Sequence, residues 1–201
     1  MEIDLRDLEV RHAHDLLTSC IIPRPIAWVS TIGGDGRMNL APFSFFTGVS
    51  WAPPILAFSV VNRPDGTMKH TLINIRKIPE FVVNVVSVDL LPIMEFSAGP
   101  LPYGSDELSI KGIHWVPGKK TRPYRVQEAK ISMECTLNRV VAVGEGPDAG
   151  NLVLGDVQLV HLRDDLLKNG REVDWLGLDP LGRLSGNRYC AVRTIIEGGA
   201  N

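Results

Sequence analysis

Short apolar segments that end in clusters of glycine, proline and aspartate run along this chain and constrain its fold more than any other feature. Residues 26–32 have the composition of a strand, and the GGDG sequence at 33–36 can supply the positive φ values of a hairpin turn. Further extended segments are expected over 38–50, 54–61, 80–86, 129–143, 151–162 and 188–192. Because strands joined mostly by short turns suit a barrel or a sandwich better than a βαβ array, the pattern predicts a mainly β protein.

A few short helices are also indicated. Apolar residues at helical spacing indicate one over 67–77, which Pro79 ends, and another follows Asp89 and ends before Gly99. Residues 99–128 are rich in proline and glycine, and so long an irregular segment is often a functional loop or a partner contact. No linker of distinct composition divides the chain, so we expect one domain over 1–201.

The composition argues against several classes of protein. With 201 residues, 44% of them hydrophobic, the chain can bury a sizeable core. Its 21 basic and 23 acidic residues give a net charge of −2, which disfavours a nucleic-acid-binding surface. No run approaches the roughly 20 apolar residues of a membrane span, and the acidic segment 1–15 does not resemble a signal peptide. We therefore expect a cytoplasmic protein with no nucleic acid or membrane partner.

Neither the cysteines nor the histidines predict a metal site. Cys20, Cys135 and Cys190 lie far apart without a CxxC pair, which disfavours both a disulfide framework and a cysteine zinc site. His12 and His14 would face the same side of a strand and could hold a metal there, but no partner ligands are evident, so a solvated pair is the preferred interpretation. We predict no bound metal.

Two glycine-rich stretches resemble catalytic motifs only superficially. The GEGPDAG sequence at 144–150 leads into a strand rather than the helix that a phosphate-binding loop requires, so a hairpin turn is expected. The GRLSG sequence at 182–186 places its serine one position too late for a nucleophile elbow. The sequence therefore contains no recognisable catalytic dyad or triad.

Two other segments each allow a structural and a functional interpretation. The NLAPFSFF sequence at 39–46 places Ser44 among three aromatic residues. This segment is either a barrel-lining strand or an apolar slot for a flat ligand, in which Ser44 gives a directional hydrogen bond. Lys69 and Thr71 open the helix expected over 67–77. They form either a plain helix cap with an exposed lysine or an anion site at the positive end of the helix. The residues alone leave both questions open.

Six segments, taken in their order and spacing, resemble one known family. They are IPRPIAWVST at 22–31, NLAPFSFF at 39–46, PPILAFS at 53–59, KHTLIN at 69–74, EFVVN at 80–84 and LGRLSGNRY at 181–189. Together they resemble the flavin reductase-like family, whose fold is an FMN-binding split β-barrel of the Greek-key type. The likeness is greater to the flavoredoxin-like branch than to the shorter reductase components of two-part monooxygenases.

The resemblance implies a homodimer that binds FMN near the subunit interface. The residues that it places at the flavin ring, its ribityl arm or the adjoining strand are Ser30, Thr31, Asn39, Ala41, Ser44, Phe45 and Ser59. It gives the phosphate to Lys69 and Thr71, and further cationic contacts to Arg24 and to Arg183 or Arg188, from either subunit. The family often has an acidic residue after the lysine, whereas this chain has His70.

The resemblance further implies an oxidoreductase that passes a hydride from NADH or NADPH to flavin, or through bound FMN to another acceptor. The protein would supply position and electrostatics, and Ser44 could stabilise the reduced flavin through a hydrogen bond to N5 or O4. The alternatives are a flavin-binding electron carrier without nicotinamide activity and an all-β interaction protein whose pocket no longer binds flavin.

Overall fold

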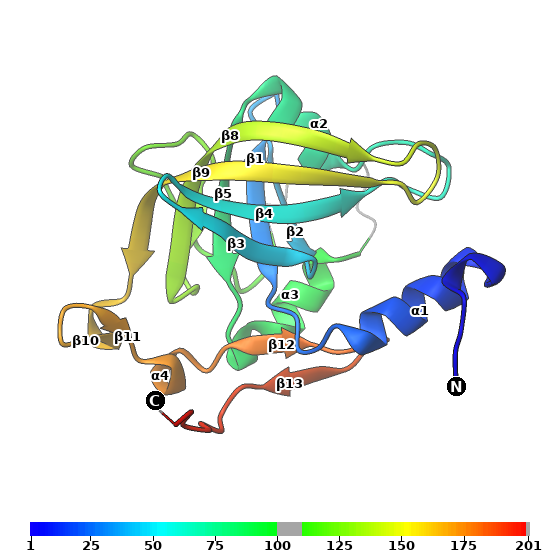
Figure 1. Ribbon diagram of the computed structural model, residues 1–201. Coiled ribbons are helices and arrows are strands. Elements are labelled where there is room, and N and C mark those ends of the chain that lie inside the picture. The colour runs from blue at the N-terminus through cyan, green and yellow to red at the C-terminus, as the bar shows by residue number, and fades with distance from the viewer. Residues whose placement is uncertain (100–109, 200–201) are drawn as a thin grey trace.

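A seven-stranded antiparallel sheet forms the body of the protein in the computed structural model, which describes residues 1–99 and 110–199 (Figure 1). Its strand order is β2-β1-β5-β8-β9-β4-β3. The strands are β1 (Ala27–Ile32), β2 (Met38–Phe43), β3 (Phe46–Trp51), β4 (Pro54–Val61), β5 (Glu80–Val85), β8 (Ile131–Val143) and β9 (Gly150–Leu162). The prediction of a mainly β protein is confirmed.

The two edges of this sheet, β2 and β3, are consecutive in the chain. Only Ser44 and Phe45 connect them, so the sheet must curl until its edges meet, and this closes it into a barrel. The backbone N–H of Ser59 on β4 donates to the Phe45 carbonyl at 2.9 Å and fixes this corner. The single extended run expected over 38–50 is therefore wrong, because the chain breaks at Ser44 to pass from one edge of the sheet to the other.

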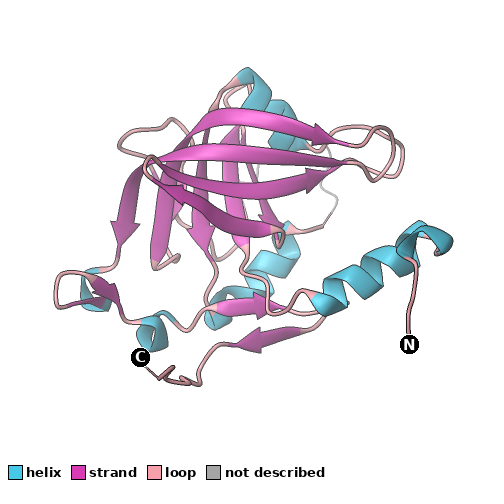
Figure 2. Cartoon of the chain, viewed as in Figure 1, coloured by secondary structure: helices cyan, strands magenta, loops and turns pink. Residues whose placement is uncertain are grey.

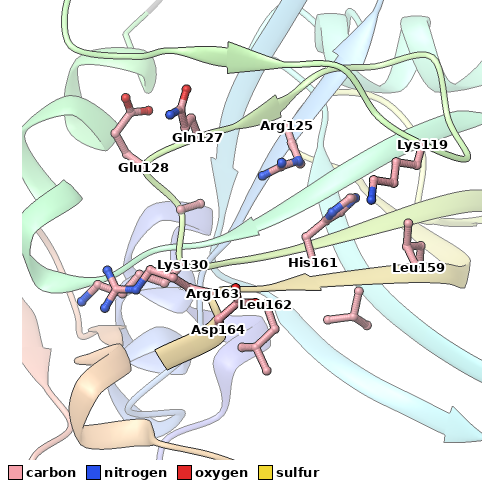
Figure 3. A pocket seen from close by; sticks show the side chains of 12 residues that line it. Lys119, Arg125, Gln127, Glu128, Lys130, Leu159, His161, Leu162, Arg163 and Asp164 are labelled. Atoms are coloured by element: carbon pink, nitrogen blue, oxygen red, sulfur yellow. The ribbon is translucent and has the colours of Figure 1, made fainter. Parts of the chain in front are cut away.

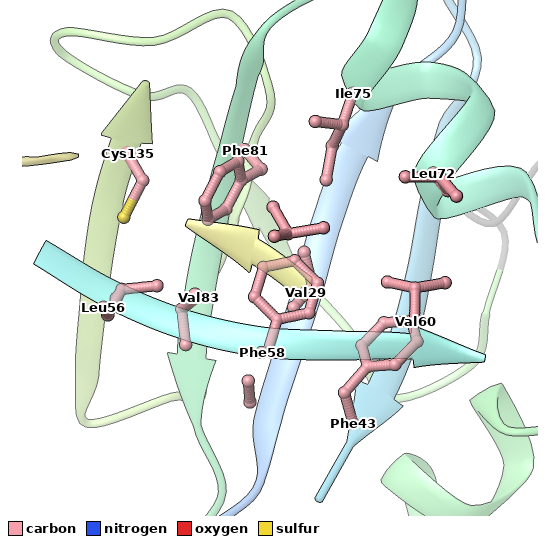
Figure 4. Close-up of a cluster of buried hydrophobic side chains, with 12 residues drawn as sticks. Val29, Phe43, Leu56, Phe58, Val60, Leu72, Ile75, Phe81, Val83 and Cys135 are labelled. Carbon is pink, nitrogen blue, oxygen red and sulfur yellow. The ribbon is translucent and has the colours of Figure 1, made fainter. Parts of the chain in front are cut away.

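An aromatic cluster fills the barrel (Figure 4). The ring of Phe58 lies 5.3 Å from that of Phe43 and 5.4 Å from that of Phe81, and all three side chains are buried. On β9, Gly155 leaves room for Phe81, because a Cβ at this position would stand 2.3 Å from the Phe81 Cζ. A larger residue on β9 would therefore collide with the centre of the core.

The other face of β1 carries a second core. Trp28 is fully buried there, and its indole N–H donates to the Ser97 hydroxyl at 2.8 Å, at the end of α3 (Leu91–Ser97). Because β1 packs on both faces, five of its six residues are buried, including the polar Ser30 and Thr31.

The remaining helices and strands surround the barrel (Figure 2). The helices are α1 (Val10–Cys20), α2 (His70–Lys77), α4 (Trp175–Leu178) and the single turns η1 (Leu5–Asp7), η2 (Val88–Leu90) and η4 (Asp164–Leu166). Small two-stranded sheets pair β6 (Trp115–Val116) with β7 (Arg125–Val126), β10 (Leu167–Lys168) with β11 (Glu172–Val173), and β12 (Leu181–Arg183) with β13 (Tyr189–Ala191). The strand expected over 188–192 is thus present outside the main sheet. Of the irregular segment expected over 99–128, residues 100–109 lie outside the described residues.

Helix α1 replaces the strand on which a metal site at His12 and His14 was considered. Residues two apart on a helix point in different directions, so the two imidazoles do not share a face. Between residues 1 and 99 and between 110 and 199, no three histidine, cysteine or acidic side chains gather as metal ligands would. No helix in these ranges is long and apolar enough to cross a membrane.

Candidate functional site

A cavity of about 430 Å³ lies between β2, the start of α2 and the end of α3. Asn39, Ala41 and Phe43 line it from β2, and Lys69, His70 and Thr71 line it from α2. Arg63 and residues 97–99 complete the wall. None of the described residues in this wall is a carboxylate, so the charged side chains that face the cavity are cationic.

The start of α2 gives the cavity the character of an anion site. Lys69 is the N-cap residue and makes no side-chain capping hydrogen bond, so the positive end of the helix meets the cavity without a capping side chain. The Lys69 side chain is exposed overall, but its ammonium lies 5.8 Å from the centre of the Phe43 ring. Desolvation of that ammonium and then the charge of Arg63 lower its pKa. An anion placed here would oppose this shift by favouring the charged ammonium.

Thr71 and His70 complete this end of the cavity. The buried Thr71 hydroxyl accepts a hydrogen bond from Asn39 Nδ2 at 3.0 Å, which ties α2 to β2. Burial and then the charge of Arg63 lower the pKa of His70 below its ordinary value, so its imidazole is neutral at pH 7. Where the family often has an acidic residue, this chain therefore presents a neutral ring that does not repel an anion.

A smaller cavity of about 210 Å³ continues the first one, because Pro42 and Ala98 line both. Its polar groups are Ser44, Arg183 and Tyr189, and Ile26 and Met94 supply apolar contacts. The two cavities thus form one elongated site, with cations at the α2 end, apolar contacts in the middle and a few polar groups at the β12 end.

Arg24 stands behind this polar end and is almost fully buried. Its guanidinium donates to the carbonyls of Thr18, Ile21 and Leu184, and its Nε donates to the Ser44 hydroxyl at 3.4 Å. Burial and then the charge of Arg183 lower the pKa of Arg24. Because protein carbonyls take most of its donors, Arg24 holds α1, the Ser44 corner and the segment after β12 together.

Arg183 and Arg188 occupy different environments. The Arg183 guanidinium lies 4.5 Å from the centre of the Tyr189 ring, donates to the Tyr189 hydroxyl and lines the smaller cavity. Arg188 is exposed, donates to Ser185 and lines neither cavity. Of the two arginines proposed from the resemblance, only Arg183 therefore reaches the elongated site within this chain.

Comparison with known proteins identifies the family. The model of a family described as "Flavin reductase like domain" matches residues 18–181. The chain belongs to this family. A curated relative from Aquifex aeolicus (strain VF5), named as an uncharacterized protein, is 35% identical to this flavin reductase-like protein over 94% of each chain.

Solved structures agree with this assignment. Nitrilotriacetate monooxygenase component B from Bacillus cereus is 31% identical, with a TM-score of 0.92 over 98% of both chains. The Pseudomonas fluorescens 2-nitrobenzoate 2-nitroreductase NbaA is 25% identical, with a TM-score of 0.89 over 100% of this chain and 96% of its own. Flavoredoxin of Desulfovibrio vulgaris (Miyazaki F), 19% identical, shares the fold, with a TM-score of 0.75 over 89% and 91%. The predicted family and its split-barrel fold are confirmed.

In this flavin reductase-like protein, the elongated site brings together Asn39, Ala41, Ser44, Lys69, Thr71 and Arg183 from the residues proposed by resemblance. Phe45 stands beside it, with the Arg24 guanidinium 5.9 Å from the centre of its ring. Arg24 itself contacts the site through Ser44. Contact of any of these residues with a flavin stays a prediction.

Ser30, Thr31 and Ser59 do not line the elongated site. Ser30 and Thr31 are fully buried on β1, where the Ser30 hydroxyl donates to the Tyr124 carbonyl at 2.6 Å and the Thr31 hydroxyl accepts from Asn74 Nδ2 at 3.1 Å. Ser59 is half-buried on β4. Their proposed place beside the flavin is a prediction that the cavity geometry of this chain does not reproduce.

Sequence reasoning missed several lining residues. Arg63 lies between the segments that carry the resemblance, although a cation two residues beyond an apolar strand could have drawn attention to it. Tyr189 lies within the LGRLSGNRY segment and could have been found there. Met94 and residues 97–99 reach the site only because α3 packs on β2, and no local pattern indicates that contact.

Proposed function

We propose that this flavin reductase-like protein is an FMN-binding oxidoreductase that takes a hydride from NADH or NADPH and passes it to flavin or, through bound FMN, to an acceptor. The observation that carries the proposal is the elongated site along β2, with Arg63 and Lys69 at the α2 end and no carboxylate among its described lining residues. A molecule with a phosphate at one end and a flat, mostly apolar ring at the other fits this distribution.

The residues of the site fit FMN in two places. At the α2 end, Lys69, Arg63 and the positive end of the helix would hold the phosphate. At the other end, the Ser44 hydroxyl accepts from Arg24, and no acceptor for its own hydrogen is found among the described residues. That hydrogen can therefore be donated to a polar edge of the ring. Bound FMN would supply the two-electron chemistry, while this chain orients the ring and shields it with Pro42 and Met94.

The names of structural relatives support the proposed chemistry. One is named as a monooxygenase component and another as a nitroreductase, and both names denote redox reactions. For this chain, the test is the visible absorption spectrum of the purified protein before and after NADPH or NADH is added without oxygen. A flavin spectrum that bleaches is expected. A flavin spectrum that persists would replace the proposal by an electron carrier, and failure to bind added FMN would refute it.

The Lys69→Gln variant tests the phosphate end directly. Because a charge-assisted hydrogen bond contributes about 1.5 kcal/mol or more, we expect FMN to bind this variant at least about tenfold more weakly, as measured by quenching of flavin fluorescence. Lys77→Gln, at the far end of the same helix, removes the same charge and is the control that should bind FMN normally. Equal affinity of both variants would place the phosphate elsewhere.

We also propose that the protein is a homodimer and works in the cytoplasm. Two apolar surfaces support a dimer: Val10 and Leu17 are exposed on α1, and Val49 and Trp51 are exposed on the edge strand β3. A second copy that covers them would remove this surface from water. Three cysteines without a disulfide support a reducing compartment.

A further inference from the structure

A second cavity, of about 590 Å³, lies away from the elongated site and shares no lining residue with it (Figure 3). Its walls come from residues 119–130, the last residues of β9 and the start of η4. The elongated site adjoins the opposite end of β9, because Gly150 pairs there with Val61, shortly before Arg63. A ligand in one cavity would therefore not occupy the other.

Positive charge predominates around this cavity. Its described charged residues are Lys119, Arg125, Lys130 and Arg163 on the basic side and Glu128 and Asp164 on the acidic side. Glu128 is already occupied, since it accepts hydrogen bonds from the backbone N–H and the Nδ1 of His114. Arg163 pairs with Asp165. Lys130 donates to two backbone carbonyls, and because carbonyls are neutral, the charge of Lys130 is not compensated. Arg125 and Lys119 remain as cations free to meet a ligand.

Arg125 is the residue that most needs a ligand. The side chain is half-buried, its Nε is buried without a hydrogen-bond partner, and no ion pair reaches the guanidinium from residues 1–99 or 110–199. A buried charged donor without an acceptor is destabilising, and proteins seldom retain one. An anion in the cavity would supply the missing acceptor.

Glu134 fixes the groups around Arg125. Its fully buried carboxylate accepts the backbone N–H groups of Lys119, Lys120 and Thr121 at 2.6–2.7 Å. It also accepts from His161 Nε2 at 2.5 Å. Both carboxylate oxygens of Glu134 are therefore already occupied by donors from the loop and from His161. The loop that carries Lys119 and the ring of His161 are held in place at the wall of the cavity.

The loop around Glu134 is tightly wound. A Cβ at Gly118 would lie 2.4 Å from the Thr121 carbonyl oxygen, so the turn that presents three amides to the carboxylate leaves no room for a side chain there. In Figure 3, Arg125, Lys119 and His161 gather in one part of the cavity, and Lys130, Arg163 and Asp164 in another. The first group thus places two cationic side chains and the ring of His161 on a rigid support.

From this geometry we infer that Arg125 and Lys119 form a binding site for a phosphoryl group, with His161 at its wall. The planar guanidinium offers paired N–H donors to two oxygens of a tetrahedral oxyanion, and the ammonium adds a point charge that suits a dianion. The cavity is far larger than an inorganic phosphate ion, so it can also take the organic part of a small phosphate ester. This inference does not depend on the binding of FMN.

Isothermal titration calorimetry of the full-length protein with inorganic phosphate and with glycerol phosphate tests the site. We expect both probes to bind, and Arg125→Gln to weaken both at least tenfold, which corresponds to about 1.4 kcal/mol. Lys119→Gln should weaken them several-fold. Arg139→Gln, an exposed arginine on β8 outside the cavity, should leave the affinities unchanged.

The variants separate this site from the proposed phosphate end of the flavin site. Loss of binding in Lys69→Gln with normal binding in Arg125→Gln and Lys119→Gln would overturn the inference, as would the absence of binding by the unaltered protein. Tighter binding of glycerol phosphate than of phosphate would assign the site to a phosphate ester, and equal binding would assign it to the free anion. Thermal melts establish that the variants fold, and Lys119, which is exposed, carries the test if Arg125→Gln does not.

Discussion

At the scale of single residues, Arg24 illustrates what a sequence motif predicts. The IPRPIAWVST segment contributes to the family resemblance and directs attention to Arg24, which donates a hydrogen bond to Ser44 at the elongated site. The motif does not reveal that three backbone carbonyls, from Thr18, Ile21 and Leu184, take most of its donors. Those acceptors lie on segments whose approach depends on the tertiary fold, so the role of Arg24 in holding them together could be found only in the structure.

The buried carboxylate of Glu134 makes the stability of the protein depend on pH. Burial by itself raises its pKa, but hydrogen bonds from His161, from the amides of Lys119 and Lys120 and from Thr121 outweigh burial and lower the pKa to about 2. A pKa lowered from 4.5 to about 2 corresponds to about 3 kcal/mol of stability. This contribution is complete above pH 4.5 and is lost as the pH falls towards 2.

We therefore expect the free energy of unfolding to drop between pH 4.5 and pH 2, and Glu134→Gln to remove most of that drop while destabilising the protein at pH 7. Urea titrations followed by circular dichroism at several pH values measure both effects. Glu145→Gln, in the exposed turn between β8 and β9, is the control for the loss of one negative charge. The same acid-induced drop in Glu134→Gln and in the unaltered protein would contradict the assignment.

At the scale of secondary structure, strands were predicted better than helices. The segments over 54–61, 80–86 and 151–162 correspond closely to β4, β5 and β9, because strongly apolar strands between turn residues are fixed by local sequence. Helix α1 was missed because acidic and polar residues dominate the first part of the chain. Val10, Ala13 and Leu17 nevertheless recur at helical spacing, and this signal could have revealed the helix.

The packing of β9 against the core predicts the effect of Gly155→Ala. The added methyl group would meet the Phe81 ring, whose nearest atoms stand 2.3 Å, 3.0 Å and 3.2 Å from it, and Phe81 is fully buried. Overpacking of this kind typically destabilises by about 1–3 kcal/mol. Chemical denaturation should show a loss in this range.

Two further variants test the reason for that loss. Gly48→Ala on the edge strand β3 places its methyl group in open space and should change stability little. Adding Phe81→Leu to Gly155→Ala should cost less than the two substitutions do separately, because the smaller side chain removes the collision. Purely additive losses would show that the Phe81 ring is not the cause.

At the scale of the whole molecule, the site could be predicted only in part. The sequence identifies β2 and the start of α2, because the NLAPFSFF and KHTLIN segments carry the family resemblance. It does not predict that α3 packs across β2 and closes the site with residues 97–99. It also does not show that Ser30 and Thr31 turn their hydroxyls into the protein. Contacts between distant segments decide these details.

The exposed apolar surfaces predict the assembly state. Trp51 is 93% exposed, so replacing it should cost the fold little. We expect light scattering at micromolar concentration with FMN present to give twice the chain mass of 22.1 kDa, and Trp51→Ser to shift the protein towards monomer. Ile196→Ser, 89% exposed near the end of the described chain, is the matched control. A monomeric mass for the unaltered protein would refute the proposed dimer.

The two-residue connection between β2 and β3 has a consequence for how the site can vary. Successive side chains of a strand point to opposite faces, so inserting one residue beside Ser44 would exchange the inward and outward faces of β3 and alter the barrel seam at the same time. The length of this connection is therefore linked to the shape of the elongated site. Relatives that keep the elongated site should tolerate changes of residue type at this corner far more readily than changes in the length of the β2–β3 connection.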